Sequence, residues 1–405
     1  MALPPYAHSH RAGKIARSYV QSGPTAYLAL AAAGRSAPAD EPGDLVADGI
    51  RVTQVAIRSL SPAATPLTPV RNLLGSYLPA LVRLARAALR TPADVVHVSG
   101  TYLLPLGVLH RHRYGSRLVL DVDERPGSSQ HRGSVARLFR PFELWLLRRL
   151  GPHADLVVVV CDNHHDLVRR SLPDTTPTTV VRNVPETRVR SAYVPPPPVG
   201  PGHPVVFTSV GSVFEGRAFE VLVEACGLLA REGAPVRVRV VGHGHPEYVA
   251  RLRELARAEG AEGVLEFTGR VAPEEIAGAY AVAHVGLALY EPSLRHNDSL
   301  PNKVLEAVSC GRPVLATGQP DTAAFLTATR TGWTVDYSAQ ALAAEMRRLA
   351  EAITDGTVDL AALCRRCRTL GDEELTWERE FAPVLGPVAA GATRPEPGAE
   401  LSPRP

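Results

Sequence analysis

Several features that mark common protein classes are missing from this sequence of 405 residues. No segment approaches the roughly 20 consecutive apolar residues that a membrane-spanning helix needs. The first residues, MALPPYAHSHRAGK, lack the apolar core of a secretory signal peptide. The net charge of +3 gives neither the basic footprint of a nucleic-acid-binding protein nor an acidic tail. We therefore expect a globular, cytoplasmic protein.

Cysteine is also scarce, with five residues scattered along the chain. Cys364 and Cys367 form a lone CxxC motif in a helical, arginine-rich stretch. A structural zinc site would need a second cysteine pair or a histidine cluster, and neither accompanies this motif. We predict no zinc site, and a reducing cytosol is the simplest compartment.

Lysine occurs only at Lys14 and Lys303, and the other strongly basic residues are arginine. This bias, with much Ala, Gly and Pro, is typical of a GC-rich genome, and it makes Lys303 notable. Hydrophobic residues make up 45% and charged residues 21%, as in ordinary globular proteins. The length predicts two domains or more, each with its own core.

Residues 290–316, YEPSLRHNDSLPNKVLEAVSCGRPVLA, predict a polar loop, a helix and a buried strand. Ser299 is a favourable N-cap, and Pro301 suits the first helical turn. Apolar residues then recur on one broad face until Gly311, which is a favourable residue for ending a helix. The short apolar run at 314–316 is typical of a parallel strand.

The predicted start of this helix carries groups that suit a nucleotide-sugar. A helix N-terminus offers unpaired N–H groups to a phosphate, and Lys303 in the first turn adds a full charge. Glu306, one turn further along, can accept hydrogen bonds from vicinal hydroxyls, and Asp298 would stand at the mouth of the same pocket. The alternative is a capped surface helix with scattered charge.

The chain before residue 190 alternates between helices and strands, though not regularly. The hydrophobic pattern predicts helices at 10–23, 74–90, 103–112 and 135–150, and strands at 26–33, 50–55, 94–98, 117–121, 155–161 and 180–184. Chains of this kind usually open with a strand, but only MALPPYAH precedes the first predicted helix. We therefore expect the opening strand to be missing or degenerate.

Two further stretches of this half are candidates for function. Open α/β sheets bind ligands beyond the carboxyl ends of their strands, which makes His97, Asp123 and Glu124 candidates for an acceptor pocket. Solvated acids at a strand end are the alternative. The helix at 135–150 places aromatic and leucine residues among arginines, which fits either peripheral contact with the inner membrane face or packing on the sheet.

The segment 193–204, YVPPPPVGPGHP, is a semi-rigid spacer by composition. We place a linker at 191–204 between an N-terminal domain at 1–190 and a C-terminal domain at 205–375. The second half alternates regularly, as in a doubly wound sheet, with predicted strands at 205–210, 236–241, 264–268 and 284–289 and helices at 219–232, 248–259 and 274–281. A helix at 376–390 and a disordered tail at 391–405 complete the prediction.

Motifs in both halves resemble those of retaining glycosyltransferases of the GT-B fold, family 4. NDSLPNKVLE at 297–306, followed by GRPV at 311–314, is similar to the family's signature around its two acids. The segments GSVFEGRAFEVLVEA, VVGHGHP and FTGRV resemble its donor-domain turns, while DVVHVSG, LVLDVDE, ADLVVVVCDN and VVRNVPE follow the family's order in the first half. TWEREF is similar to the helix that crosses back. The resemblance implies two Rossmann-like doubly wound domains facing across a cleft.

The resemblance also implies roles for the matched residues. Glu306 is expected to bind the ribose hydroxyls of the nucleotide, Asp298 to contact the donor sugar, and Arg217 to neutralise the diphosphate. Asp298, Arg217 and Lys303 form the implied catalytic set. The residues expected at the donor are Gly211, Ser212, Arg217, Gly242, Arg270, Val271, Asp298, Ser299, Leu300, Pro301, Asn302, Lys303 and Glu306.

These roles imply transfer of a hexose-type sugar from a nucleoside diphosphate to an acceptor hydroxyl, with retention. Arg217, Lys303 and the helix start would stabilise the leaving diphosphate in place of a metal, so we expect no metal or other cofactor and nominate no protein nucleophile. The acceptor can be a saccharide, a lipid-linked molecule or a small natural product, and we expect no nucleic acid.

The sequence departs from the family's pattern at three of these positions. Ser212 stands where the family typically has an arginine, Asp123 where it has a histidine, and Asp298 where it has a glutamate. The missing arginine at position 212, with the degenerate N-terminus, favours an alternative, a non-catalytic nucleotide-sugar-binding or partner subunit. A third reading, an epimerase or phosphorylase of the same fold, lacks a recognisable cofactor lysine.

Overall fold

The computed structural model describes residues 10–22, 28–33, 44–47, 50–56, 78–123, 125, 134–189, 193–200, 202–272, 275–292 and 300–389. The chain divides into two compact units. Unit 1 comprises Met1–Val159, Arg169–Thr179 and Phe381–Pro405, and unit 2 comprises Val160–Val168 and Val180–Glu380. The predictions of a degenerate opening strand and of a disordered tail fall outside the described residues.

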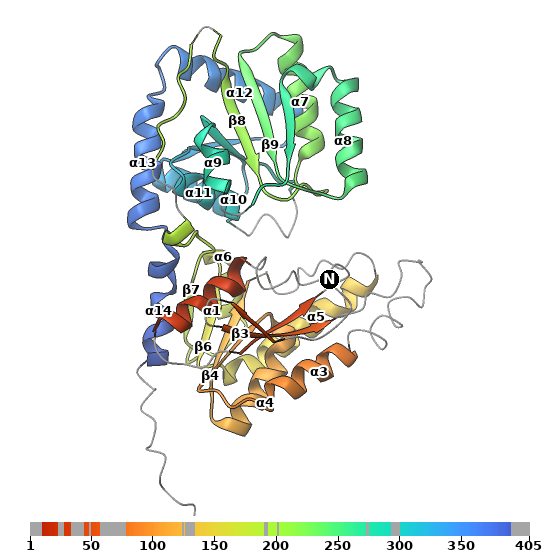
Figure 1. Cartoon of the computed structure of the whole chain (residues 1–405), viewed down its shortest axis with the longest axis vertical. Coiled ribbons are helices and arrows are strands. Elements are labelled where there is room, and N and C mark those ends of the chain that lie inside the picture. The colour runs from red at the N-terminus through yellow and green to blue at the C-terminus, as the bar shows by residue number, and fades with distance from the viewer. Residues whose placement is uncertain are drawn as a thin grey trace, which may run out of the picture. The chain divides into compact units, whose positions relative to one another are not determined.

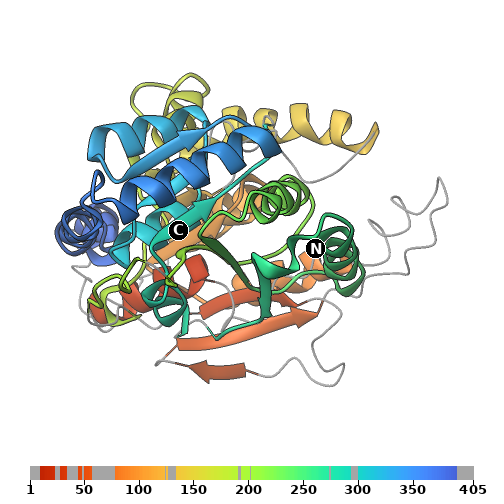
Figure 2. The same cartoon turned by 90° about the horizontal axis from the view of Figure 1, so that it is seen from above.

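The first half of the chain contains two small sheets. One has four strands in the order β4 (Val95–Ser99), β5 (Arg117–Val122), β6 (Leu156–Val159) and β7 (Thr178–Val180). The other has β3 (Ile50–Ala56) between β1 (Leu28–Ala33) and β2 (Asp44–Ala47), drawn in red and orange in Figure 2. The helices of this half are α1 (His10–Ser22), α3 (Leu78–Ala88), α4 (Leu104–Tyr114), α5 (Ser134–Leu150) and α6 (Asp162–Arg169).

The predicted strand at 180–184 is wrong. β7 ends at Val180, and residues 181–184 form no strand. The backbone N–H of Arg182 donates to the Glu380 carboxylate at 3.0 Å, and the guanidinium of Arg182 pairs with the same carboxylate. Because a distant side chain satisfies this N–H group, it is not available to a neighbouring strand. Glu380 lies on α14 (Trp377–Ala389).

Unit 2 is built on a six-stranded sheet in which all neighbouring strands are parallel (Figure 1). The strand order is β10 (Leu265–Gly269), β9 (Val236–Val241), β8 (Val205–Val210), β11 (Val285–Ala288), β12 (Val314–Thr317) and β13 (Gly332–Val335). The helices are α7 (Phe219–Arg231), α8 (Pro246–Ala258), α9 (Ile276–Ala281), α10 (Asn302–Ser309), α11 (Pro320–Thr329), α12 (Ala339–Thr354) and α13 (Leu360–Glu373). This order confirms the prediction of a doubly wound sheet.

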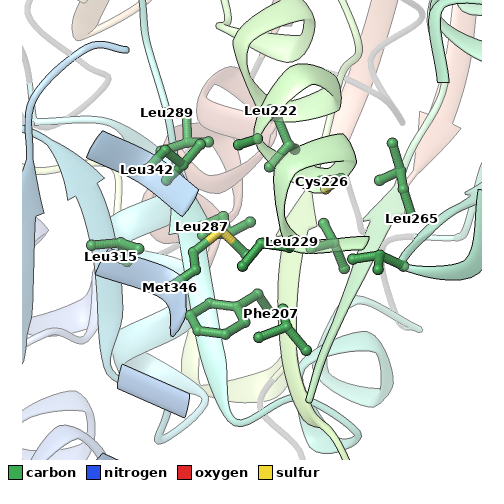
Figure 3. Packing of buried hydrophobic residues seen from close by; sticks show 14 of the residues in the cluster. Phe207, Leu222, Cys226, Leu229, Leu265, Leu287, Leu289, Leu315, Leu342 and Met346 are labelled. Carbon is green, nitrogen blue, oxygen red and sulfur yellow. The ribbon is translucent and has the colours of Figure 1, made fainter. Parts of the chain in front are cut away.

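The core of unit 2 lies between the sheet and α7, α8 and α12, where apolar side chains interlock (Figure 3). Phe207 and Leu287 come from the central strands, and Leu229 and Met346 come from the covering helices. All four are buried. The apolar runs that predicted parallel strands are therefore explained by burial on both faces of the sheet.

The proline-rich segment at 193–200 is docked on unit 2. The buried Arg312 guanidinium donates to the carbonyls of Val194 and Pro195 and to carbonyls near the end of α9. His284 accepts a hydrogen bond from the Val206 N–H at Nδ1, which leaves Nε2 to donate to the Pro197 carbonyl at 3.1 Å. These contacts fix the described part of the predicted linker to the sheet of unit 2.

α5 confirms the predicted helix and has two different faces. Leu146 and Leu147 are buried, whereas Phe142 and Trp145 are 47% and 52% exposed and stack on each other at 5.9 Å. Across the stretches that the structure describes, no helix has both the length and the hydropathy to cross a membrane.

The CxxC cysteines are structural in this fold. Cys364 and Cys367 are fully buried on α13, and both thiols are free. Burial raises the pKa of Cys364 to about 11. The described residues contain no group of three or more His, Cys, Asp or Glu side chains that is arranged to hold a metal ion.

Candidate functional site

The strand order of unit 2 places one crevice at the carboxyl end of the sheet. β8 is followed through α7 by β9 on one side, while β11 lies on its other side. The chain therefore changes direction between β8 and β11, and doubly wound sheets bind ligands at such a point. The loop that follows β8 and the residues that follow β11 are the first places to look for binding groups.

The turns that follow β8, β9 and β10 are joined by backbone hydrogen bonds on one side of this crevice. Gly211 N–H donates to the Val241 carbonyl and Gly242 N–H to the Gly269 carbonyl, both at 2.8 Å. A Cβ atom at Gly242 would lie 1.8 Å from the Gly211 carbonyl oxygen, so only glycine fits there. Arg270 and Val271 follow β10 at this edge, with Arg270 exposed.

On the other side of the crevice, α10 begins at Asn302, and Pro301 is its N-cap. The prediction of Ser299 as the N-cap is therefore wrong. Pro301 is extended and its carbonyl accepts from Val304 N–H, which starts the helical hydrogen-bond pattern two residues later than predicted. Leu300 is partly buried and Asn302 is exposed at this start. Asp298 and Ser299 lie outside the described residues.

The amine of Lys303 is buried, and its pKa is lowered. Its Nζ atom donates to Ser209 Oγ at 3.2 Å and lies 5.3 Å from the centre of the Phe219 ring. These contacts place the amine between the carboxyl end of β8 and the start of α7. Burial, and then the nearby Arg217 guanidinium, lowers the pKa of Lys303 to about 7, while Glu306 acts in the opposite direction.

Arg217 lies in the loop between β8 and α7 and is held by three groups. Its Nη1 donates to the Ser212 carbonyl at 3.1 Å. Its guanidinium carbon lies 5.8 Å from the centre of the Phe214 ring and 5.9 Å from that of the Tyr290 ring. The structure thus brings Arg217 close to Lys303 and to the carbonyl of Ser212.

Glu306 lies one turn into α10 and is partly exposed. Its negative charge acts on the Lys303 amine, and it also contributes to the raised pKa of the Tyr280 hydroxyl after the larger effect of burial. Both effects place the carboxylate near the first turns of the helix. A carboxylate there can accept hydrogen bonds from sugar hydroxyls.

Sequence reasoning missed the residues that fix the chain after β11. Thr317 Oγ1 accepts from Tyr290 N–H at 2.9 Å and donates to the Tyr290 carbonyl at 3.1 Å. The Gln319 amide donates to the same carbonyl at 3.0 Å, and both side chains are buried. The available signal was the polar sequence TGQ at 317–319, where β12 ends.

The site gathers two basic side chains and a helix start around one crevice. Among the described residues, neither Lys303 nor Arg217 forms an ion pair within 4.0 Å, although Lys303 is buried. The start of α10 adds the partial positive charge of its N–H groups. Two cations and a helix N-terminus around one crevice can bind a doubly charged anion such as a diphosphate.

The acceptor candidates of unit 1 lie in different surroundings. The His97 side chain is only 4% exposed, and its Nδ1 lies 3.1 Å from the Tyr19 hydroxyl. Its ring stacks on Phe381 at 6.4 Å. Asp123 is exposed just after β5, and Glu124 lies outside the described residues. The structure therefore does not place His97 and Asp123 on one exposed surface.

A buried ion pair lies beside His97. Arg11 on α1 donates to both carboxylate oxygens of Asp121 at 2.8 Å. Burial alone would raise the pKa of Asp121, but Arg11 and His97 hold it well below its usual range. This pair fixes α1 to the end of β5.

Comparisons with known proteins cover most of the chain. The family model described as "Glycosyl transferase 4-like domain" matches residues 9–184, and the model described as "Glycosyl transferases group 1" matches residues 204–352. The chain is 29% identical over 201 residues to WcaL of Escherichia coli (strain K12), a protein assigned a glycosyltransferase role in colanic acid biosynthesis. It is 26% identical over 191 residues to the amylovoran biosynthesis glycosyltransferase AmsK of Erwinia amylovora.

These matches are partial for the curated relatives and nearly complete for solved structures. The aligned part covers 48% of the chain and 48% of WcaL, and 46% of the chain and 46% of AmsK, so the match spans about half the length of each relative. Sucrose-phosphate synthase of Thermosynechococcus elongatus is similar over 93% of the chain and 91% of its own, with 17% identity and a TM-score of 0.69. HepE of Anabaena, in complex with UDP, is similar over 95% and 96%, with 14% identity and a TM-score of 0.65.

Proposed function

Given that the chain has the GT-B fold and that its two halves match glycosyl transferase family models, we propose that it is a glycosyltransferase that uses a nucleoside-diphosphate sugar. The donor is bound at the carboxyl end of the unit 2 sheet. The observation that carries this proposal is the pair of basic side chains at this crevice, Lys303 at the start of α10 and Arg217 in the loop before α7, neither of which forms an ion pair within 4.0 Å among the described residues.

The donor is held by groups with separate roles. Arg217, Lys303 and the N–H groups at the start of α10 bind the diphosphate, and Glu306 binds the ribose hydroxyls. The backbone of residues 299–302 and the Asp298 side chain contact the sugar. The turns after β8, β9 and β10, with Gly211, Ser212, Gly242, Arg270 and Val271, line the nucleotide.

The chemistry follows from charge. Cleavage of the sugar–phosphate bond builds negative charge on the leaving diphosphate and positive charge on the sugar. Arg217 and Lys303 stabilise that diphosphate without a metal ion. The acceptor hydroxyl attacks from the face that the diphosphate leaves, so the configuration at the anomeric carbon is retained and no protein nucleophile takes part.

The first test is a binding and turnover screen. UDP, GDP, dTDP and ADP and their common sugars are titrated by calorimetry with and without EDTA, because UDP occupies the similar HepE structure. Glu306→Ala is expected to lose donor affinity and keep its melting temperature, whereas Glu254→Ala, an exposed acid on α8, keeps both. Donor affinity unchanged by Glu306→Ala would refute the placement of the ribose.

Turnover separates the enzyme from the alternative that the serine at position 212 raised, a non-catalytic nucleotide-sugar-binding or partner subunit. Saccharide, lipid-linked and small natural-product acceptors are offered with the donor that binds. Release of the nucleoside diphosphate that depends on an acceptor establishes the enzyme, and NMR of the product reports whether configuration is retained. Donor binding without release in any acceptor class would support the subunit.

We also propose that α5 brings the enzyme to the inner membrane face in the cytoplasm. Phe142 and Trp145 expose a stacked aromatic pair, and Arg148 and Arg149 are exposed in the next turn. Flotation with vesicles that contain anionic lipid is expected to carry the chain, and Phe142→Ser with Trp145→Ser is expected to abolish this. Val282→Ser, at an exposed apolar residue of unit 2, is the control. Equal flotation of all three proteins would exclude this surface.

A further inference from the structure

Phe214 is an unusual residue for its position. It lies in the polar loop between β8 and α7, at the mouth of the proposed donor site, and it is 44% exposed. An apolar side chain of this size gains little from so partial a burial. Its ring faces the guanidinium of Arg217 at 5.8 Å, which is within the range of a cation–π interaction.

Tyr290 approaches the same guanidinium from a different strand end. It follows β11, its ring centre lies 5.9 Å from the guanidinium carbon of Arg217, and it is 7% exposed. Its backbone N–H and carbonyl are both bound by Thr317, which fixes where its ring can lie. The next residue, Glu291, donates its N–H to the Gly216 carbonyl at 3.1 Å, and this joins the two loops directly.

From these contacts we propose that Phe214 and Tyr290 are positioning residues that hold the Arg217 guanidinium at the diphosphate of the donor. An arginine side chain loses rotamer entropy when it binds a phosphate. The two rings and the Ser212 carbonyl restrict the side chain before the donor arrives, so less entropy is lost on binding.

This inference rests on the proposed function, but it predicts a separate result for the affinities of diphosphate and monophosphate ligands. If the rings act through Arg217, their removal weakens binding of ligands that reach Arg217 and leaves shorter ligands unaffected. In the proposed site a diphosphate reaches Arg217 and Lys303, whereas a monophosphate lacks the distal phosphate. A role in folding alone would lower both affinities together.

The test compares UDP with UMP, or the matching pair for the base that the screen selects. Phe214→Leu and Tyr290→Leu are expected to weaken diphosphate binding about threefold to tenfold, the range of one cation–π contact, and monophosphate binding less than twofold. Phe214→Tyr and Tyr290→Phe keep a ring and are expected to restore the diphosphate affinity. Melting temperatures identify any variant that fails to fold.

A double-variant cycle decides between the remaining outcomes. Arg217→Ala is expected to lose diphosphate affinity, and Phe214→Leu added to it is expected to cause no further loss, because the ring then has nothing to position. Equal losses for both ligands, or additive losses in the double variant, would overturn the inference and leave the proposed function intact. If the unchanged chain binds neither nucleotide, the proposed function fails and this inference fails with it.

Discussion

Donor binding is expected to be coupled to the uptake of a proton by Lys303. In the ligand-free protein the ammonium is disfavoured because it is buried and close to Arg217, so the pKa is about 7. Glu306 partly offsets this, and the remaining neighbours, Ser209 and the Phe219 ring, carry no charge. A bound diphosphate brings negative charge to the same amine and raises its pKa.

The size of the effect follows from these values. At pH 8.5 an amine with a pKa of about 7 is almost entirely neutral, so a donor that restores the ammonium takes up about one proton. Affinity is then expected to fall about tenfold, or about 1.4 kcal/mol, for each pH unit above 7 until the pKa of the bound state is reached. Below pH 6 the amine is already charged and the dependence disappears.

Calorimetry at one pH in buffers of different ionisation enthalpy measures this proton directly. A nucleoside-diphosphate sugar is the better ligand, because its phosphates do not titrate in this range. Lys303→Arg keeps its charge and is expected to bind without proton uptake. Lys14→Arg removes the other lysine of the chain and is expected to keep the uptake. No proton uptake by the unchanged chain at pH 8.5, or the same uptake by Lys303→Arg, would refute the reasoning.

Three further predictions concern stability. The pKa of Lys303 lies below its usual 10.5, so the stability that the neutral amine contributes is complete above pH 10.5 and is lost as the pH falls to about 7, by at most about 5 kcal/mol. Lys303→Met is therefore expected to raise the melting temperature of the ligand-free protein at pH 7. An unchanged melting temperature would contradict the burial of a charged amine. Gly242→Ala is expected to destabilise unit 2 by more than about 2 kcal/mol in urea titrations, because its Cβ would overlap a carbonyl, whereas Gly263→Ala has free space around it and is the control. Arg312→Ala leaves several buried carbonyls without a donor and is expected to cost about 3 kcal/mol in the same titration; a loss below about 1 kcal/mol would show that water replaces the guanidinium.

The strand β13 of unit 2 was not predicted, but the other five strands of its sheet could be, because their determinants are local. Each strand is a short apolar run, each connection contains a helix, and the sequence pattern therefore shows the alternation directly. The strand at 180–184 was predicted wrongly for the opposite reason. The apolar residues there suit a strand, but the N–H of Arg182 is satisfied by Glu380, 198 residues away. Sequence pattern contains no information about such a partner.

The candidate site also combines residues that the sequence reveals with contacts that it does not. Arg217 and Lys303 could be found because charge in a glycine-bearing turn and at a helix start has a direct chemical meaning. The contacts that hold them could not be found, since Phe214 and Tyr290 read as ordinary apolar residues of separate loops. Only the fold brings both rings to one guanidinium. His97 was read as a strand-end residue, but α1 and α14 cover it with Tyr19 and Phe381.

The serine at position 212 removes a side-chain cation, but the charge balance of the proposed site does not require one there. The diphosphate of a nucleotide-sugar carries about two negative charges. Arg217 supplies one positive charge, and Lys303 supplies the second once the donor has raised its pKa. A third cation beside them would disfavour the ammonium of Lys303 further in the empty site. A loop with one well-positioned arginine and one lysine that gains its proton on binding is therefore sufficient for a donor site, and Ser212 alone is not an argument against catalysis.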